Sequence, residues 1–384
     1  MWMRNSLALI LTSSVLSLAE VAAAAPEYRV SVVGPVNSRA WDINSRGVVV
    51  GRYTVSGELT RAFLSRGKGW VDLGTLGGIS SRAVAINDRG EVVGNWVTSA
   101  GQWRGAIWFR GRARDIGVIG GANTYYWDIN NAGYSVAYSA QPGDGAMRSY
   151  LRAPNGRLRN IGYLPYTPPT TEAFALNNRN QVAGASGEFS FPEMQLHGFI
   201  WTRGVMRDVG GLETPTVVYD INDRGQATGG GPLPGEFRVS RAFFYSNGRL
   251  TYLDRRPEND FPYSQGYGIN NRGYLVGESD DLRAFIYRGR RMQSLTPLVD
   301  PAWRIDEARS INDAGQIAAT ATRGGLQYAV RLDLIRPSAE PAPVIEPDDD
   351  APLLTAPLSP EQAAAEARLD AEAQAREVTR PVEP

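Results

Sequence analysis

The sequence of 384 residues predicts an all-β fold, a seven-bladed β-propeller of four-stranded antiparallel blades. One short phrase, Asp-Ile-Asn-Ser-Arg-Gly at 42–47, recurs in seven related copies along the chain. The asparagines of these copies lie 43, 43, 47, 45, 48 and 42 residues apart. A period in the forties that is filled with short strands is typical of propeller blades. Each period holds four apolar stretches separated by turn residues, enough for one antiparallel blade.

The first 24 residues predict an export signal. Arg4 supplies a positive charge, residues 6–18 form a short apolar core, and Ala22 to Ala24 offer a cleavage site. An uncleaved anchor helix is the alternative, but the apolar stretch is short for a membrane span. The chain contains no Cys, which excludes disulfides and thiolate metal sites. We therefore expect a periplasmic or extracellular protein with no stable membrane span after cleavage.

The C-terminal segment 336–384 differs in composition from the rest. It carries 11 acidic residues and 4 Arg, a net charge of −7, whereas the body between the two ends carries +7. Because the segment is rich in Pro, Ala and Glu and has few apolar groups to bury, we expect a disordered tail. A single capped helix over 359–377 that docks elsewhere is the alternative. The predicted propeller thus occupies 27–335.

The repeated turn has a mechanical explanation. Asn at its first position can accept a hydrogen bond from the backbone two residues on, and Gly at its last position can adopt a positive φ. In the fourth copy Asn replaces Gly, and Asn tolerates positive φ next best. We interpret these as structural turn residues: Asn44 and Gly47, Asn87 and Gly90, Asn130 and Gly133, Asn177 and Asn180, Asn222 and Gly225, Asn270 and Gly273, Asn312 and Gly315. Calcium binding is the alternative, although the third and sixth copies have no carboxylate in the turn.

A bulky residue stands three positions before most of these asparagines. With strict alternation it shares a strand face with the Ile or Leu just before Asn. We expect this set to pack one blade against the next, and stacking of sugars or bases is the alternative. Its members are Trp41, Val84, Trp127, Phe174, Tyr219 and Tyr267, with Arg309 as the exception.

At this point the pattern resembles a known family. Ile-Asn-x-x-Gly-x-Val-x-Gly, a His-Ala-Phe-like triplet and Asp-Leu-Gly-x-Leu-Gly-Gly, best seen at 72–78, are similar to the HAF repeat of predicted bacterial extracellular proteins. The resemblance covers residues 28–334 and implies an exported propeller without an enzymatic activity to carry over. His197 supplies the family's naming residue once, and Arg61, Arg148, Arg241 and Arg283 replace it elsewhere.

The N-terminal strand is expected to close the ring. Six fourth-strand segments follow the seven turns, and the chain then reaches the proline-rich tail. Residues 28–35 precede the first Ile-Asn much as 71–74 precede the second, so they should pair into the last blade and remove the open sheet edges. An open array of repeats is the alternative.

Candidate chemistry is sparse. One His, no Cys and one Lys leave no metal centre, phosphate-cradling loop or catalytic triad, and we assign no catalytic residue and no cofactor. The positive charge of the body is interpreted as spread over solvated strand faces, which argues against nucleic acid. We expect a monomeric binding or scaffold module for a protein or glycan. A carbohydrate-active enzyme is the alternative, which a carboxylate pair at the channel mouth would favour.

Recognition is expected at the long loops between second and third strands. Residues 185–196 and 229–239 are long, whereas 278–282 is short, and irregular loops on a rigid frame commonly bind partners. The candidate binding residues are Phe189, Phe191, Met194, Leu196 and His197. Packing of these apolar groups over the blade edge is the alternative.

Overall fold

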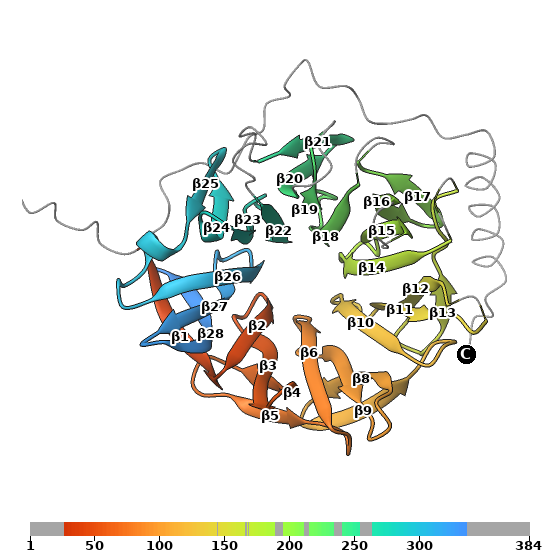
Figure 1. Cartoon of the computed structure of the whole chain (residues 1–384), viewed down its shortest axis with the longest axis horizontal. Helices are drawn as coiled ribbons and strands as arrows, with labels where there is room; N and C mark the ends of the chain where they lie inside the picture. The colour runs from red at the N-terminus through yellow and green to blue at the C-terminus, as the bar shows by residue number, and fades with distance from the viewer. Residues whose placement is uncertain are drawn as a thin grey trace, which may run out of the picture.

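The computed structural model describes residues 27–335 apart from 144, 166, 168, 189–194, 211–214, 234–239 and 254–262. These residues form seven four-stranded antiparallel sheets arranged as a ring (Figure 1). The expected fold class is confirmed. The predicted export signal and the acidic tail lie outside the described residues.

Each blade is a meander that runs from the centre of the ring outward. Blades one to three consist of β2 (Ser38–Ile43), β3 (Val49–Ser56), β4 (Leu59–Ser65), β5 (Val71–Gly74); β6 (Ser80–Ile86), β7 (Val92–Val97), β8 (Trp103–Phe109), β9 (Arg112–Gly117); β10 (Thr124–Ile129), β11 (Ser135–Ala140), β12 (Met147–Arg152) and β13 (Leu158–Asn160). Blades four to six consist of β14 (Thr171–Leu176), β15 (Val182–Glu188), β16 (Gln195–Thr202), β17 (Val205–Asp208); β18 (Val217–Ile221), β19 (Ala227–Gly231), β20 (Arg241–Ser246), β21 (Arg249–Tyr252); β22 (Ser264–Ile269), β23 (Leu275–Ser279), β24 (Arg283–Arg288) and β25 (Arg291–Ser294). Blade seven consists of β26 (Arg304–Ile311), β27 (Ile317–Arg323), β28 (Leu326–Leu334) and β1 (Tyr28–Val36), and a short 3-10 helix, η2 (Thr296–Leu298), precedes it.

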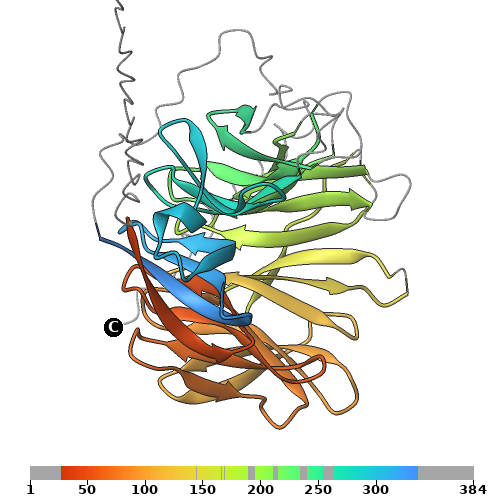
Figure 2. The same cartoon turned by 60° about the vertical axis from the view of Figure 1, so that its left-hand side comes forward.

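The N-terminal strand closes the ring as expected. β1 pairs antiparallel with β28, from Tyr28 opposite Leu334 to Val36 opposite Tyr328 (Figure 2). The side chain of Tyr28 is 2% exposed and belongs to the core of the last blade. Glu27 forms an ion pair with the buried Arg288 of blade six at 2.5 Å. The strand that leads into blade one therefore completes the sheet of blade seven and covers the edge of β28.

The ring has two flat ends, which we name by their connections. The turn face carries the Asn turns between first and second strands and the turns between third and fourth strands. The loop face carries the connections between second and third strands and those between blades. Both described ends of the chain lie at the turn face, because Leu334 packs beside Gly315 of the last Asn turn and Ile335 donates a backbone hydrogen bond to Glu27.

A β-bulge in every innermost strand overturns the expected face of the bulky residues. In β2 the ladder runs from Ala40 opposite Gly51 to Asp42 opposite Val50, so that Trp41 is an extra residue. The same shift occurs in β6, β10, β14, β18, β22 and β26. Ile43 packs toward Ala318 and Ala329 of the preceding blade, whereas Trp41 packs toward the following one. A bulge breaks the alternation of side chains between the two faces of a strand. The prediction that Trp41 and Ile43 share a face assumed unbroken alternation and is therefore wrong.

The bulge also explains the second glycine of the repeat. A Cβ at Gly51 would lie 2.1 Å from the carbonyl oxygen of Arg39, and one at Gly94 would lie 2.1 Å from that of Arg82. No side chain fits at such distances unless the backbone shifts. Glycine at this position therefore lets the second strand lie close against the bulged first strand in five blades, whereas blades three and seven carry Ala137 and Ala319 there.

Candidate functional site: the central channel and the turn face

A closed circle of hydrogen bonds surrounds the channel at the turn face. In each blade the side-chain Oδ1 of the turn asparagine accepts backbone N–H groups two and four residues on, as Asn44 does from Arg46 at 3.1 Å and Val48 at 3.0 Å. This confirms the expected turn geometry. The Nδ2 group of each asparagine donates to the backbone oxygen of the next one, at 2.8–3.1 Å, in the order Asn44, Asn87, Asn130, Asn177, Asn222, Asn270, Asn312 and again Asn44. Sequence reasoning missed this role, because it joins residues of different blades.

Three aspartates line the channel beneath this circle and clamp the blades in pairs. Asp42 accepts the N–H of Ile43 at 2.8 Å and that of Ile86 in the next blade at 2.8 Å. Asp128 and Asp220 do the same for blades three and four and for blades five and six. The equivalent positions in the second members of these pairs are Ala85, Ala175 and Gly268, which leave room for the carboxylates. In blade seven the hydroxyl of Ser310 donates to Asp42 at 2.7 Å.

The environment of these aspartates raises their pKa values. Burial first, and then the charges of Asp42 and Asp220, hold the pKa of Asp128 well above its usual range. Burial raises the pKa of Asp220 to about 7, against hydrogen bonds from Ile269 and Ile221 that lower it. Among the residues that the structure describes, no group of three or more His, Asp or Glu side chains is placed to hold a metal ion.

The next layer of the channel is aromatic. A cavity of about 170 Å³ is bounded by the three aspartates and by the bulged residues of all seven blades. Ring contacts run from Trp41 to Trp127 at 5.8 Å, and on through Phe174 and Tyr219 to Tyr267. Arg309 completes the circuit, because its guanidinium lies 4.0 Å from the Tyr267 ring and 5.7 Å from the Trp41 ring. The bulky residues thus contact one another around the channel.

Toward the loop face, Arg82 and Glu172 stand at the end of this aromatic layer. The guanidinium of Arg82 lies 4.6 Å from the ring centre of Trp103, 5.6 Å from that of Trp127 and 5.7 Å from that of Trp41. Burial lowers the pKa of Arg82 to about 10. Burial raises the pKa of Glu172 to about 7, against a hydrogen bond from Tyr138.

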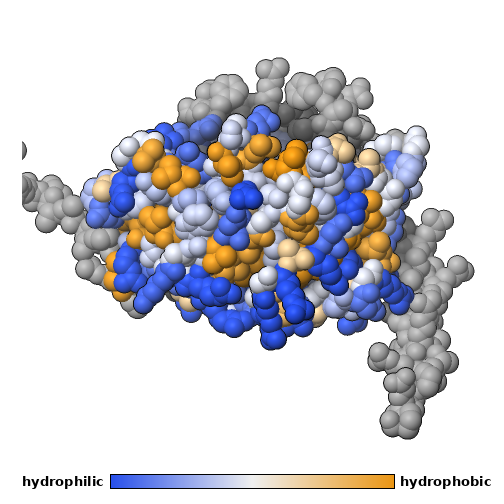
Figure 3. Space-filling model, turned by 90° about the horizontal axis from the view of Figure 1, so that it is seen from below, coloured by the Kyte–Doolittle hydropathy of each residue, from blue (hydrophilic) through white to orange (hydrophobic). Residues whose placement is uncertain are grey.

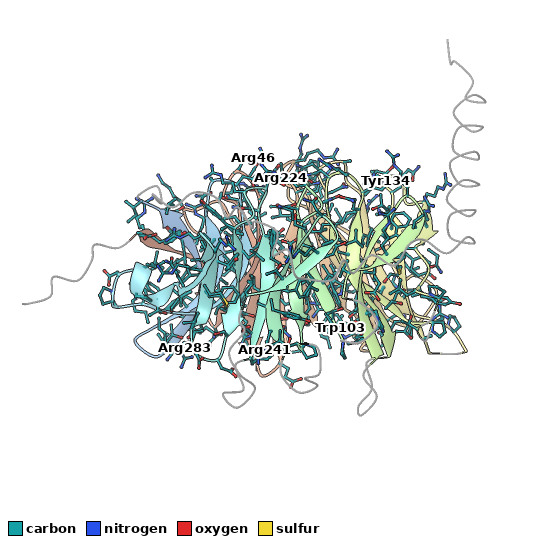
Figure 4. All side chains as sticks on the ribbon, turned by 90° about the horizontal axis from the view of Figure 1, so that it is seen from above. Arg46, Trp103, Tyr134, Arg224, Arg241 and Arg283 are labelled. Carbon is teal, nitrogen blue, oxygen red and sulfur yellow. The ribbon has the colours of Figure 1, made fainter. Side chains whose placement is uncertain are left out.

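The turn face is strongly basic, which corrects the interpretation of the charges as spread over strand faces. Arg46 and Arg224 extend from this face, while Arg241 and Arg283 lie toward the other end of the ring (Figure 4). Hydrophilic side chains crowd one edge of the rim, and hydrophobic atoms form a band at mid-height (Figure 3). The exposed cationic side chains of the Asn turns are Arg46, Arg89, Arg179, Arg224 and Arg272; those in and beside the turns between third and fourth strands are Arg66, Lys68, Arg110, Arg112, Arg157, Arg203, Arg290 and Arg291.

Few acidic groups balance these charges. The turns between third and fourth strands contain no Asp or Glu, and the Asn turns contribute Asp88, Asp223 and Asp313. Arg89 pairs with Glu91 at 2.5 Å. Within the part of the chain that the structure describes, the other cationic side chains of this set form no ion pair. The positions were readable from the sequence, because both kinds of turn lie at the same end of a meandering blade.

The candidate binding loop is only partly described. Phe189, Phe191 and Met194 lie outside the described residues. Leu196 is 4% exposed in β16, so it belongs to the blade interior and does not offer a contact surface. His197 is half-buried, and its Nδ1 lies 2.9 Å from Oδ2 of Asp208 in β17.

The same pairing occurs at Arg61, one of the arginines that replace this histidine, and at Arg104, which holds the equivalent place in blade two. Arg61 reaches Asp72 at 2.9 Å and Arg104 reaches Asp115 at 2.6 Å, in each case from the third to the fourth strand of one blade. These carboxylates also accept a backbone N–H two residues on, from Gly74 and Gly117. In these three blades the triplet residue therefore ties the outer strand to the blade. Arg148 instead donates to the backbone oxygen of Pro169, and Arg283 lies 3.9 Å from Asp306 of blade seven.

Comparison with known proteins gives the fold alone. No protein-family model matches the chain, and no curated protein matches it. The β-propeller domain of the Trilobed protease from Pyrococcus furiosus, described as having an open velcro topology, is similar at 10% identity and a TM-score of 0.51, over 78% of this chain and 99% of that one. YCF48 bound to D1 peptide is similar at 10% identity and a TM-score of 0.50, over 80% and 97%. A prolyl endopeptidase is similar at 11% identity and a TM-score of 0.51, over 79% of this chain and 50% of that one. Within the described residues no helix is long and apolar enough to cross a membrane.

Proposed function

We propose that this chain is an exported, non-catalytic propeller that binds an anionic lipid surface through its turn face. The repeat pattern and the predicted signal support export and membership of the HAF-repeat family. The observation that carries the binding proposal is the set of exposed arginines on one flat end of the ring. Arginine matches phosphate with two parallel hydrogen bonds, which a lysine cannot provide. A flat basic face can bring many such groups to a plane of lipid phosphates at once.

The state of the channel supports a non-catalytic role. Both carboxylate oxygens of Asp42, Asp128 and Asp220 are engaged by backbone N–H groups of two blades. Because both oxygens of each carboxylate already accept backbone hydrogen bonds, these groups are poorly placed to attack a substrate. The raised pKa of Glu172 follows from its burial, and Glu307, at the equivalent place in blade seven, pairs with Arg309. The carbohydrate-active alternative needs two free carboxylates, and the engagement of these side chains disfavours it.

The test compares vesicles that differ only in headgroup charge. The chain without residues 1–24 is mixed with vesicles of phosphatidylcholine alone or with phosphatidylglycerol, and binding is measured by co-sedimentation. We expect binding to the anionic vesicles that weakens as salt is added, because exposed charges are screened within about 10 Å at 0.1 M ionic strength.

Matched variants locate the surface. Replacing Arg46, Arg179, Arg224 and Arg272 by Gln removes four charges from the turn face. Since each basic residue near an anionic membrane contributes about 1 kcal/mol, affinity should fall by at least about tenfold. The control removes four exposed arginines that lie elsewhere, Arg39, Arg283, Arg304 and Arg323. Equal losses in both variants, equal binding to neutral vesicles, or binding to double-stranded DNA without binding to vesicles would each contradict the proposal.

A further inference from the structure

The described chain ends on the basic face. Ile335, the last described residue, is bonded to Glu27 at the turn face of blade seven. This blade has no turn between third and fourth strands, because its outer strand comes from the other end of the chain. The described chain therefore ends in blade seven, which stands between blades six and one. Arg290 and Arg291 lie on one side of this end, and Arg66 and Lys68 lie on the other.

The segment that follows this end has the opposite charge. Residues 336–384 carry 11 acidic groups against 4 Arg, and they include three consecutive aspartates, Asp348 to Asp350. The body carries a net +7 against the −7 of the segment, and the structure shows that the exposed positive groups gather on the face where the segment begins. The acidic segment thus begins on the face that carries the exposed positive charges.

The length of the segment allows it to cover this face. A chain of 49 residues can extend to about 160 Å, whereas a compact domain of this size has a radius of gyration of only about 20 Å. A covalently attached segment also acts at an effective concentration in the millimolar range. Weak individual contacts between carboxylates and arginines can therefore accumulate without any partner from outside.

We infer that residues 336–384 dock on the arginines of the turn face and compete with anionic ligands for them. This inference rests on the proposed function, since it names how the same face is regulated. Carboxylates on the segment neutralise the arginines in one state. A surface with a higher density of phosphate displaces the segment in the other. The three aspartates are the densest group of negative charge that it offers.

The first test measures the tail in isolation. The chain ending at Ile335 retains every described strand, and a labelled peptide of residues 336–384 is titrated with it while fluorescence anisotropy is recorded. We expect saturable binding that is lost at high salt. It should weaken at least about tenfold in the variant Arg46→Gln, Arg179→Gln, Arg224→Gln, Arg272→Gln and remain unchanged in the control Arg39→Gln, Arg283→Gln, Arg304→Gln, Arg323→Gln. A peptide that does not bind, or that binds both variants equally, overturns the inference.

The second test measures competition. The chain that ends at Ile335 should bind phosphatidylglycerol vesicles at least about tenfold more tightly than the full chain, and Asp348→Asn, Asp349→Asn, Asp350→Asn should produce part of that gain. If full and shortened chains bind the vesicles equally, the inference fails and the proposed function stands. If neither binds vesicles while the peptide still binds the ring, the proposed function fails and docking of the tail stands.

Discussion

The side-chain amide of Asn312 donates a hydrogen bond of 3.0 Å to the backbone oxygen of Asn44, across 268 residues of sequence. This bond joins the last blade to the first and completes the circle of asparagines. At the rim the same two blades are joined a second time, because β1 pairs with β28 in blade seven and the chain continues from β1 into β2 of blade one. The ring is thus closed at its inner and its outer radius by independent devices.

The asparagine circle predicts that single substitutions in it are costly. Asn87→Ala removes the donor bonds to Asn130 and to the Glu91 carboxylate, and two acceptor bonds within the turn. At 0.5–1.5 kcal/mol for each hydrogen bond, the free energy of unfolding should fall by about 2–4 kcal/mol in urea denaturation. Asn87→Asp keeps the acceptor but loses both donor bonds and places its carboxylate beside that of Glu91, so its loss should be at least as large.

Asn155 provides the control for this prediction. It lies in an exposed turn between third and fourth strands, and its side chain bonds only Arg157, at 3.0 Å, within its own turn. Asn155→Ala should therefore cost less than about 1 kcal/mol. A similar loss at Asn87 and Asn155 would mean that the bonds between blades contribute little.

The N-terminal strand should matter more than the tail. Removing residues 27–36 exposes the edge of β28 and deletes the core residue Tyr28. It also removes Glu27, which forms an ion pair with the buried Arg288. We expect aggregation or a clear fall in Tm by differential scanning calorimetry. Removing 337–384 should leave Tm nearly unchanged at moderate salt, where tail contacts are screened. Equal tolerance of the two truncations would argue that the ring is not held by its closure.

Stability should fall as the pH rises from about 4.5 toward 7. Burial raises the pKa of Glu172 to about 7, so its protonated form is favoured in the folded state relative to the unfolded chain. The contribution is complete below the unfolded pKa and is lost as the pH passes the folded pKa. Glu172→Gln should flatten this dependence in thermal melts recorded across the range. An unchanged slope in the variant would assign the effect to other groups, with Asp220 next in line.

The glycine opposite the bulge should resist substitution. Gly94→Ala places a Cβ 2.1 Å from the backbone oxygen of Arg82, and forcing strands apart in a packed core costs about 1–3 kcal/mol. The reciprocal change, Ala137→Gly in blade three, relieves no such contact and should cost at most about 1 kcal/mol. Chemical denaturation of both variants checks the comparison. Equal costs would show that the two blades accommodate Cβ in the same way.

The closed seven-bladed fold could be predicted from the sequence, because every repeat contains the residues that form its first turn. Asn marked every turn between first and second strands, with Gly at its last position in all but the fourth, and the missing seventh outer strand identified the strand at 28–35 as the closure. The bulge at Trp41 could not be read from a pattern that assumes strict alternation. The bonds from Asn44 to Asn87 and from Asp42 to Ile86 also depend on how neighbouring blades approach, which no single repeat encodes.

The candidate site was predicted less well, for a different reason. Apolar residues in a long loop drew attention to Leu196, which the structure places in the interior of a blade. Net charge averaged over the body hid the arginines of the turn face, because an average does not record position. Mapping each Arg onto its place in the repeat would have found Arg46, Arg224 and their equivalents.

Two positions before the turn asparagine, aspartate in one blade alternates with Ala or Gly in the next. This alternation divides the first six blades into three couples of neighbouring blades. Asp42, Asp128 and Asp220 each hold their own blade to the next, and seven is an odd number, so the last blade reaches Asp42 through Ser310 instead. Two kinds of junction follow. Junctions inside a couple carry an extra carboxylate bridge, and those between couples lack it. The junction between blades two and three has instead two hydrogen bonds between the side chain of Asn95 and the backbone of Tyr126. New chain ends introduced by circular permutation should therefore be tolerated better between blades four and five than between blades three and four.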